Sequence, residues 1–246
     1  MPIPRISRRE LGRFDMKRLF VIFMALCVCI GFLGRPMYVS AMSDLVFSKN
    51  ASKIKKVALT FDDGPHPRYT HQILEILAEY GVTATFFVIG INAERYPEAM
   101  AELASSGCEI GNHTYSHNSI QYAGQAQIEQ ELLDCQRQIF SQTGQTPTLF
   151  RPPEGRFNQS LEQAAACMNY RIILWSIDTK DWAHTPSQTI VREVLAQIEH
   201  GDIILMHDYI SGTNTTCDAL RSLIPTLQSK GYEFVSVSEL INGDDR

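Results

Sequence analysis

Five short polar motifs, well separated in the chain, carry the side chains best suited to chemistry. They are Asp62-Asp63-Gly64-Pro65, His113-x-x-x-His117, Arg151-Pro152-Pro153, Asp178 with Asp181-Trp182, and His207-Asp208. Of two adjacent carboxylates, one can bind a metal while the other stays free as a base. Two histidines four residues apart on one helical turn suit zinc, which takes imidazole and carboxylate ligands. Together these residue types indicate metal-assisted acid–base chemistry.

Each motif taken singly also has a structural explanation. Asp, Gly and Pro are the residues that turns select, Arg151 could pair with surface carboxylates, and His207 could be a core histidine. What favours a functional role is that every motif lies at the end of a predicted strand. Independent coincidences would not all fall at strand ends that point the same way.

The elements that must position these motifs can be read from the apolar pattern. From Lys56 onward, seven apolar runs alternate with segments of helical period; the runs are 57–61, 84–89, 109–112, 148–151, 170–175, 203–206 and 233–235. This alternation predicts a mostly parallel sheet with helices outside, and seven units favour a single-domain, distorted (β/α)7 barrel. An open doubly wound sheet is the competing architecture. In a barrel, polar groups at the carboxyl ends of the strands meet at one mouth.

With their neighbouring residues, the five motifs resemble those of the polysaccharide deacetylases, the NodB-type domains of carbohydrate esterase family 4. The resemblance rests on Thr60-Phe61-Asp62-Asp63-Gly64-Pro65, His113-Thr114-Tyr115-Ser116-His117, Arg151-Pro152-Pro153, Asp178-Thr179-Lys180-Asp181-Trp182 and Leu205-Met206-His207, in that order. It covers residues 56–241. The resemblance implies an enzyme that hydrolyses N-acetyl groups of amino sugars.

The resemblance also implies a metal site and a base. Asp63, His113 and His117 would bind one divalent metal ion, with zinc expected, and leave positions open for water and substrate. Such an ion lowers the pKa of a water molecule and polarises an acetamide carbonyl. Asp62 would be the general base, held in place and kept ionised by Arg151.

By the same resemblance, His207 would be the general acid that protonates the departing amine. Asp181 would orient its imidazole, so that acid and base have partners of opposite charge. Trp182 and Leu205 would line the slot for the acetyl methyl group, although Leu205 could equally be ordinary core.

One position departs from the family pattern. Glu154 stands where the family usually has Tyr after the two prolines. The backbone N–H of this residue is expected to complete the oxyanion hole, and a backbone donor survives any side-chain change except to Pro. We therefore expect catalysis to persist with a shifted substrate preference.

The sequence is compatible with several substrates and with one function of another class. Peptidoglycan sugars come first, chitooligosaccharides or another secreted polysaccharide second, and O-acetyl xylan is an ester alternative. From a different class, an inactive glycan-binding paralogue would be signalled by loss of a metal ligand or of the base, and none is lost. A purely structural wall protein gives no reason for the ligands, the acid and the base to occur together.

Composition and charge limit the partners. The chain has 246 residues, of which 44% are hydrophobic and 20% charged, so a disordered chain is excluded. The formal net charge is −5; residues 1–41 hold seven Lys/Arg and two Asp/Glu, which leaves 15 basic and 25 acidic residues for the rest. An acidic body argues against a nucleic-acid partner. The expected partner is an N-acetylated glycan, and no protein partner is implied.

The N-terminal residues are predicted to direct export. An uncharged apolar stretch, 19–34, lies between Arg18 and Arg35 and is short for a stable membrane span. Residues 1–41 are therefore read as a signal peptide or an N-terminal membrane anchor, with translation starting at Met1 or Met16. Residues 42–55 are read as a linker and 242–246 as a tail. The domain is then extracytoplasmic, either secreted or tethered to the outer face of the membrane, with membrane contact only through the N-terminal segment.

The four cysteines of the body form no close pair. Their positions, Cys108, Cys135, Cys167 and Cys217, disfavour a thiolate zinc site. Buried free thiols are expected, while disulfide formation after export is left open.

Overall fold

The computed structural model describes residues 45–50, 54–120, 122–210 and 215–243. The predicted signal or anchor segment, 1–41, and residues 244–246 of the predicted tail lie outside this range. The described residues belong to one compact unit, Asp44–Arg246. No helix in the described ranges combines the length and the apolar character needed to cross a bilayer.

Parallel strands form the centre of the structure. In sheet order they run β1-β6-β5-β4-β3-β2-β8-β7, with β9 beside β2. The bounds are β1 (Val46–Phe47), β2 (Lys56–Asp62), β3 (Thr85–Val88), β4 (Glu109–Asn112), β5 (Leu149–Phe150), β6 (Arg171–Ile173), β7 (Ile177–Asp178), β8 (Ile203–His207) and β9 (Glu233–Phe234). The named strands pair only in parallel, so their carboxyl ends lie at one end of the sheet.

Strands β2 to β8 form the distorted (β/α)7 barrel that the sequence predicts. Its seam lies between β6 and β7, which are not neighbours in the hydrogen-bonded order of the described strands. The sequence pattern gives a single apolar run here, 170–175, and does not show β7 as a strand of its own. The chain bends between β6 and β7 at Leu174–Ser176, where the Ser176 N–H donates to the Ile203 carbonyl instead of continuing β6.

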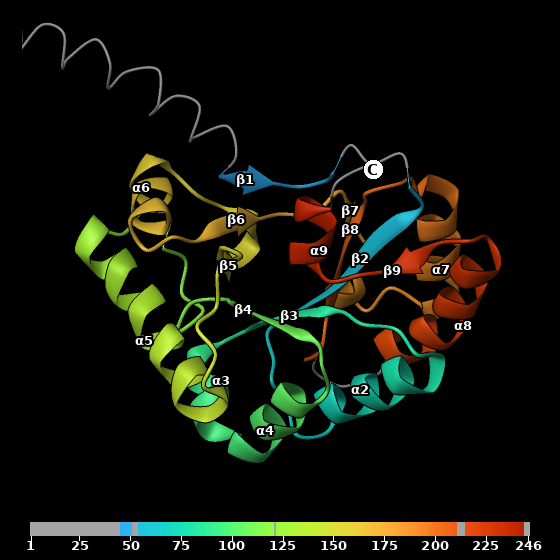
Figure 1. Cartoon of the computed structure of the whole chain (residues 1–246), viewed down its shortest axis with the longest axis horizontal. Coiled ribbons are helices and arrows are strands. Elements are labelled where there is room, and N and C mark those ends of the chain that lie inside the picture. Colours follow the sequence, from blue (N-terminus) through green and yellow to red (C-terminus); the bar gives the residue numbers. More distant parts are fainter. Residues whose placement is uncertain (1–44, 51–53, 121, 211–214, 244–246) are drawn as a thin grey trace, which may run out of the picture. The chain divides into compact units, whose positions relative to one another are not determined.

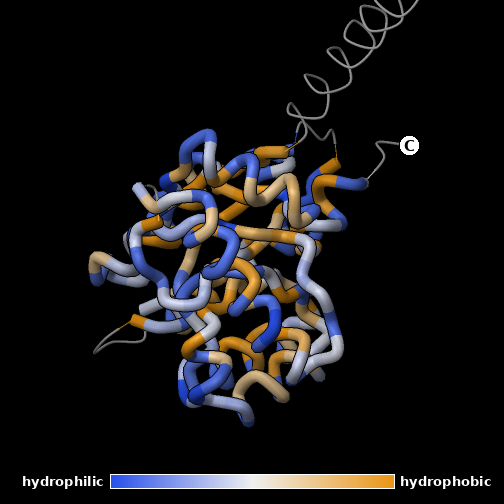
Figure 2. The backbone as a smooth tube through the Cα atoms, turned by 90° about the vertical axis from the view of Figure 1, so that its left-hand side faces the viewer, coloured by the Kyte–Doolittle hydropathy of each residue, from blue (hydrophilic) through white to orange (hydrophobic). Residues whose placement is uncertain are grey.

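Helices form an outer layer around the strands, except that α9 lies over the strands in the middle of the view (Figure 1). They are α2 (Tyr69–Tyr80), α3 (Gly90–Arg95), α4 (Pro97–Ser105), α5 (Gln125–Thr143), α6 (Gln159–Cys167), α7 (Ser187–Gln197), α8 (Thr215–Ser229) and α9 (Val237–Asn242). The apolar periodicity predicts α2, α5, α7 and α8. Along the chain, hydrophobic and hydrophilic stretches alternate (Figure 2), as expected for elements that bury one face.

Strand β2 shows how the two faces of a barrel strand differ. Val57, Leu59 and Phe61 pack in one cluster with buried residues of α2 and α8, between barrel and helices. The alternate residues point to the other side, because successive side chains of a strand face opposite ways. Ala58 joins the interior cluster with residues of β5, β6, β8 and α9. The same alternation directs Asp62 into the barrel.

Part of the predicted linker is a strand. Within 42–55, Val46 and Phe47 form β1 and pair with Ile172 and Ile173 of β6. Leu45 is buried against the second core cluster. A two-residue strand gives too short a pattern to be found in the sequence; the exposed edge of β6 recruits it.

Among the described residues, Cys108, Cys135, Cys167 and Cys217 form no disulfide. Cys135 and Cys217 are buried, as the sequence analysis expects, whereas Cys108 is half-buried and Cys167 is exposed.

Candidate active site

A cavity of about 510 Å³ opens at the carboxyl ends of the barrel strands. It is lined by Asp62, Asp63, His113, His117, Glu154, Arg156, Trp175, Asp178, Trp182, Leu205 and His207. These residues come from the ends of β2, β4, β5, β6, β7 and β8 or the loops that follow them. Because all of these strands are parallel, residues far apart in the sequence reach the same mouth.

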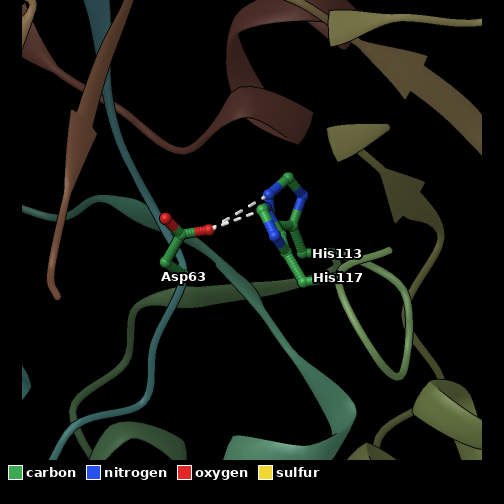
Figure 3. Close-up of side chains that lie close together, drawn as sticks. All are labelled: Asp63, His113 and His117. Carbon is green, nitrogen blue, oxygen red and sulfur yellow. Dashed lines mark ion pairs between the residues drawn. The ribbon is translucent and has the colours of Figure 1, made fainter. Parts of the chain in front are cut away.

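Three potential metal ligands gather on one side of this cavity. One ligand atom each from Asp63, His113 and His117 lies within 4.8 Å of the others. Both imidazole rings turn toward the same carboxylate oxygen (Figure 3): Asp63 Oδ1 is 3.4 Å from His113 Nε2 and 3.1 Å from His117 Nε2. This oxygen is buried and has no hydrogen-bond donor among the described residues. The set of one carboxylate and two imidazoles suits a divalent transition metal with open positions.

The surroundings of the cluster favour its use as a ligand set. His113 Nδ1 is 2.7 Å from the Arg151 carbonyl oxygen and can donate to it, which leaves the lone pair of Nε2 facing Asp63. Burial would raise the pKa of Asp63, but the imidazoles of His113 and His117, which face its carboxylate, hold that pKa far below its usual range. The carboxylate of Asp63 also raises the pKa of His117.

Asp62 is buried next to the cluster and is paired with a buried cation. Arg151 Nη1 donates to Asp62 Oδ1 at 2.7 Å and to Thr60 Oγ1 at 2.8 Å. The rest of the guanidinium donates to the carbonyls of Ile173 (3.1 Å) and Leu174 (3.0 Å), where the chain leaves β6. Arg151 therefore connects the end of β6 to Thr60 and Asp62 of β2. Burial lowers the pKa of Arg151, and Asp62 opposes that change.

His207 lies at the end of β8 and is paired with a buried anion. Its Nδ1 is 2.8 Å from Asp181 Oδ1, and its backbone N–H donates to Asp181 Oδ2 at 2.8 Å. Asp181 also accepts from Trp182 N–H (2.9 Å) and Thr216 Oγ1 (2.8 Å), so its orientation is fixed. Burial would lower the pKa of His207, but Asp181, followed by the charges of Asp62 and Asp63, raises it to about 9.

The loops that carry the site contain most of the strained backbone. Among the described residues, seven non-glycine residues have positive φ, and six of them lie in these loops: Asp63 (77°), Thr114 (67°), His117 (56°), Glu154 (58°), Lys180 (53°) and His184 (58°). Such conformations cost of order 1–3 kcal/mol each and persist where surrounding contacts impose them. The concentration of strain at one mouth is typical of a functional site.

The structure brings the predicted site residues together. Eight of them line the cavity, namely Asp62, Asp63, His113, His117, Glu154, Trp182, Leu205 and His207. Arg151 and Asp181 lie behind this layer, each fully buried. Trp182 is 56% exposed, which suits a residue at the rim, whereas Leu205 is 3% exposed and also belongs to the barrel wall.

The sequence analysis left three lining residues out of the site: Arg156, Trp175 and Asp178. Trp175 is the last residue of the predicted run 170–175, and Asp178 belongs to one of the five polar motifs without a role assigned to it, so a position at a strand end is the signal that could have identified both. Arg156 carries no such signal. It pairs with Glu154 across 3.0 Å between Nη1 and Oε2, so the residue that departs from the family pattern brings a second charge to the cavity.

Known proteins resemble both the sequence and the structure. Residues 49–173 match the model of a family described as polysaccharide deacetylase. A Bacillus cereus peptidoglycan-N-acetylglucosamine deacetylase is 39% identical over 189 residues, 76% of this chain and 88% of the relative. A chitooligosaccharide deacetylase from a Bradyrhizobium strain is 36% identical over 203 residues, covering 78% and 93%. The crystal structure of the Bc1960 peptidoglycan N-acetylglucosamine deacetylase superposes with a TM-score of 0.77 at 34% identity, covering 82% of this chain and 94% of that one. The chain therefore belongs to the polysaccharide deacetylase family.

Proposed function

We propose that this chain removes N-acetyl groups from amino sugars of peptidoglycan by metal-dependent hydrolysis. One observation carries the proposal: the cluster of Asp63, His113 and His117 lies between a carboxylate paired with a buried cation and an imidazole paired with a buried anion. Amide hydrolysis needs a base, an acid and a charge-stabilising centre within reach of one carbonyl.

The cluster fits a divalent metal, and we infer zinc. The buried, unpartnered Oδ1 of Asp63 and the two imidazole nitrogens facing it form a ligand set that zinc commonly takes. When bound, such an ion supplies a Lewis acid that lowers the pKa of water and polarises the acetamide carbonyl.

The two paired residues divide the proton transfers between them. Asp62 has Oδ1 occupied by Arg151, so Oδ2 is the oxygen available to accept a proton from the attacking water. His207 has Nδ1 turned to Asp181, so Nε2 is the nitrogen that donates a proton to the leaving amine. A carbon–oxygen bond forms, the carbon–nitrogen bond breaks, and the products are acetate and a free amino sugar. The backbone N–H of Glu154 is proposed to donate to the oxyanion.

Peptidoglycan is the favoured glycan, because a relative named for that substrate shares 39% identity over 76% of this chain. Such a substrate also places the enzyme outside the cytoplasmic membrane, with residues 1–41 acting as the export signal or anchor. The relative named for chitooligosaccharides keeps short N-acetylglucosamine oligomers as the second candidate. The Glu154–Arg156 pair at the mouth is proposed to shift preference among these glycans, because it makes this rim charged.

Acetate release by the full-length protein tests the proposal. Peptidoglycan and N-acetylglucosamine oligomers would be compared with added zinc, after chelation, and for Asp62→Asn. We expect release from peptidoglycan that disappears on chelation and falls by at least about 100-fold in Asp62→Asn, the scale of general-base contributions. Asp178→Asn is the matched control, because Asp178 lines the same cavity without a role in the proton transfers.

Each of the other possible outcomes would indicate a different substrate or a different function. Release only from the oligomers would move the substrate to chitooligosaccharides, and release only from O-acetyl xylan would make the protein an esterase. No release by folded, zinc-loaded protein would favour an inactive glycan-binding protein. If Glu154→Tyr leaves the rank order of glycans unchanged, the proposed effect of Glu154 on preference is wrong.

A further inference from the structure

Asp208 is a buried carboxylate beside the site that the proton transfers above do not use. It directly follows β8 and is 1% exposed. Its Oδ2 accepts a hydrogen bond from Thr70 Oγ1 at 2.5 Å, and its Oδ1 has no partner among the described residues. Burying a carboxylate with one oxygen unpaired costs free energy. Stability alone therefore does not account for this side chain, and such a group calls for an explanation.

The carboxylate of Asp208 packs directly against the turn that carries Asp63. A Cβ atom at Gly64 would overlap this carboxylate, so the side chain of Asp208 occupies the space beside a residue that has none. Thr70, which donates to Asp208, accepts in turn from the backbone N–H of His66 at 2.7 Å. Asp208 thus contacts the turn at Gly64 and, through Thr70, is linked to His66.

The turn needs such support because Asp63 is in the left-handed region, with φ of 77°. Two hydrogen bonds hold it: the side-chain Nδ2 of Asn92 donates to the Asp63 carbonyl at 2.8 Å, and the backbone N–H of Ile89 donates to the Gly64 carbonyl at 2.8 Å. The side chain of Asp208 covers the turn at Gly64. Its own N–H donates to the Asp62 carbonyl at 3.1 Å.

The pairing of β2 with β8 links the contact between Asp208 and the turn at Gly64 to His207, the proposed general acid. Asp62 and His207 are paired residues of β2 and β8, so Asp208 lies one residue beyond that pair. We propose that Asp208 is a positioning residue that holds the Asp63 carboxylate in its ligand position and at a fixed separation from His207. This inference rests on the proposed metal-dependent function.

Zinc affinity measures this role without relying on turnover. The metal-free, full-length protein would be titrated with zinc by calorimetry as wild type, Asp208→Ala, Asp208→Asn and Asp202→Ala. We expect Asp208→Ala to weaken zinc binding by about 10- to 100-fold, the usual effect of losing a residue that supports a ligand. Asp208→Asn should restore most of the affinity, because an amide oxygen can still accept from Thr70.

Asp202 is the matched control, since it lies at the opposite end of the same strand. It is 2% exposed and accepts from Ser176 Oγ at 2.8 Å and from Glu199 N–H at 2.6 Å. Asp202→Ala should lower the thermal midpoint while leaving zinc affinity unchanged. Thr70→Val provides a second test if Asp208→Ala does not fold, and should weaken zinc binding in the same direction.

The possible results distinguish failure of the inference about Asp208 from failure of the proposed function. If wild type binds zinc and Asp208→Ala or Thr70→Val binds it equally well, Asp208 does not position the ligand. Equal weakening in Asp202→Ala would show a general effect of destabilisation and would also overturn the inference. Failure of the wild type to bind zinc would contradict the proposed metal site itself.

Discussion

At the scale of single residues, the two groups proposed to carry protons have opposite electrostatic surroundings. Asp62 faces a guanidinium that is fully buried, and His207 faces a carboxylate that is fully buried. An ionised base and a protonated acid can therefore coexist at one pH. Neither partner is exposed, so salt in the solvent screens these pairs only weakly.

The pH dependence of activity should report the pair formed by His207 and Asp181. The pKa of His207 is raised to about 9, so its proton is present below that pH and is lost above it. We expect kcat/KM to fall on the alkaline side, and Asp181→Asn to move that fall to lower pH because the anion that favours the imidazolium is gone. Asp178→Asn should leave the alkaline limb in place. An unshifted limb in Asp181→Asn would contradict the assignment of His207 as the acid.

Stability should depend strongly on Arg151. Arg151→Met would leave Asp62 as an unpaired buried charge and would also remove the donors to the Ile173 and Leu174 carbonyls. We expect a loss of about 3–5 kcal/mol in the free energy of unfolding, measured with urea. Arg221→Met removes an exposed ion pair with Glu79 and is expected to change little. Comparable losses in both variants would mean that the hydrogen bonds of Arg151 to Asp62 and to the end of β6 stabilise the fold no more than an exposed ion pair does.

At the scale of elements, the joints that lead from a helix into a strand fix where the strand begins, at the end of the barrel opposite the site. Gly201 precedes β8 with φ of 80°, and its carbonyl accepts the Asn50 N–H at 2.9 Å. A Cβ atom at Gly201 would overlap the Asn50 carbonyl. Gly201 therefore provides both a left-handed turn and close approach of the N-terminal segment.

Substitutions at two glycines distinguish the cost of a left-handed backbone from the cost of the close contact with Asn50. Gly144 ends α5 with φ of 69° and has open space where a Cβ would lie. Gly144→Ala should cost about 1–2 kcal/mol from backbone strain alone. Gly201→Ala should cost more, because the segment around Asn50 must also move. Urea unfolding of both variants measures the difference, and equal costs would show that the contact with Asn50 contributes nothing.

At the scale of the whole molecule, residues before the predicted domain complete its core. β1 covers the edge of β6, and Leu45 and Phe47 pack into two different hydrophobic clusters. An uncovered parallel edge exposes both backbone groups and apolar side chains. The stable unit therefore begins before Lys56, the first residue of the predicted domain.

Two shortened proteins test this boundary. A protein that begins at residue 55 should have a lower thermal midpoint and aggregate more readily than one that begins at residue 42, because the former lacks β1. Thermal unfolding followed by circular dichroism, with light scattering in parallel, measures both effects. Identical midpoints would show that β1 adds nothing to the fold.

The sequence by itself determined the residue types of the site, their order and the parallel barrel. These features follow from local patterns: apolar runs define strands, and parallel strands bring their carboxyl ends together whatever the length of the connections. The strand pattern predicts that polar residues at strand ends meet at one mouth, and the resemblance of their motifs to those of the family identifies Asp63, His113 and His117 among them as one ligand set.

Only the tertiary structure decided how individual atoms meet. It sets which nitrogens of His113 and His207 face the cavity and which backbone carbonyls the Arg151 guanidinium reaches. It places the side chain of Asp208 in the space beside Gly64. It also turned part of the predicted linker into β1. Each of these features joins residues far apart in the chain, and their pairing depends on strand register and close packing, which no local sequence pattern encodes.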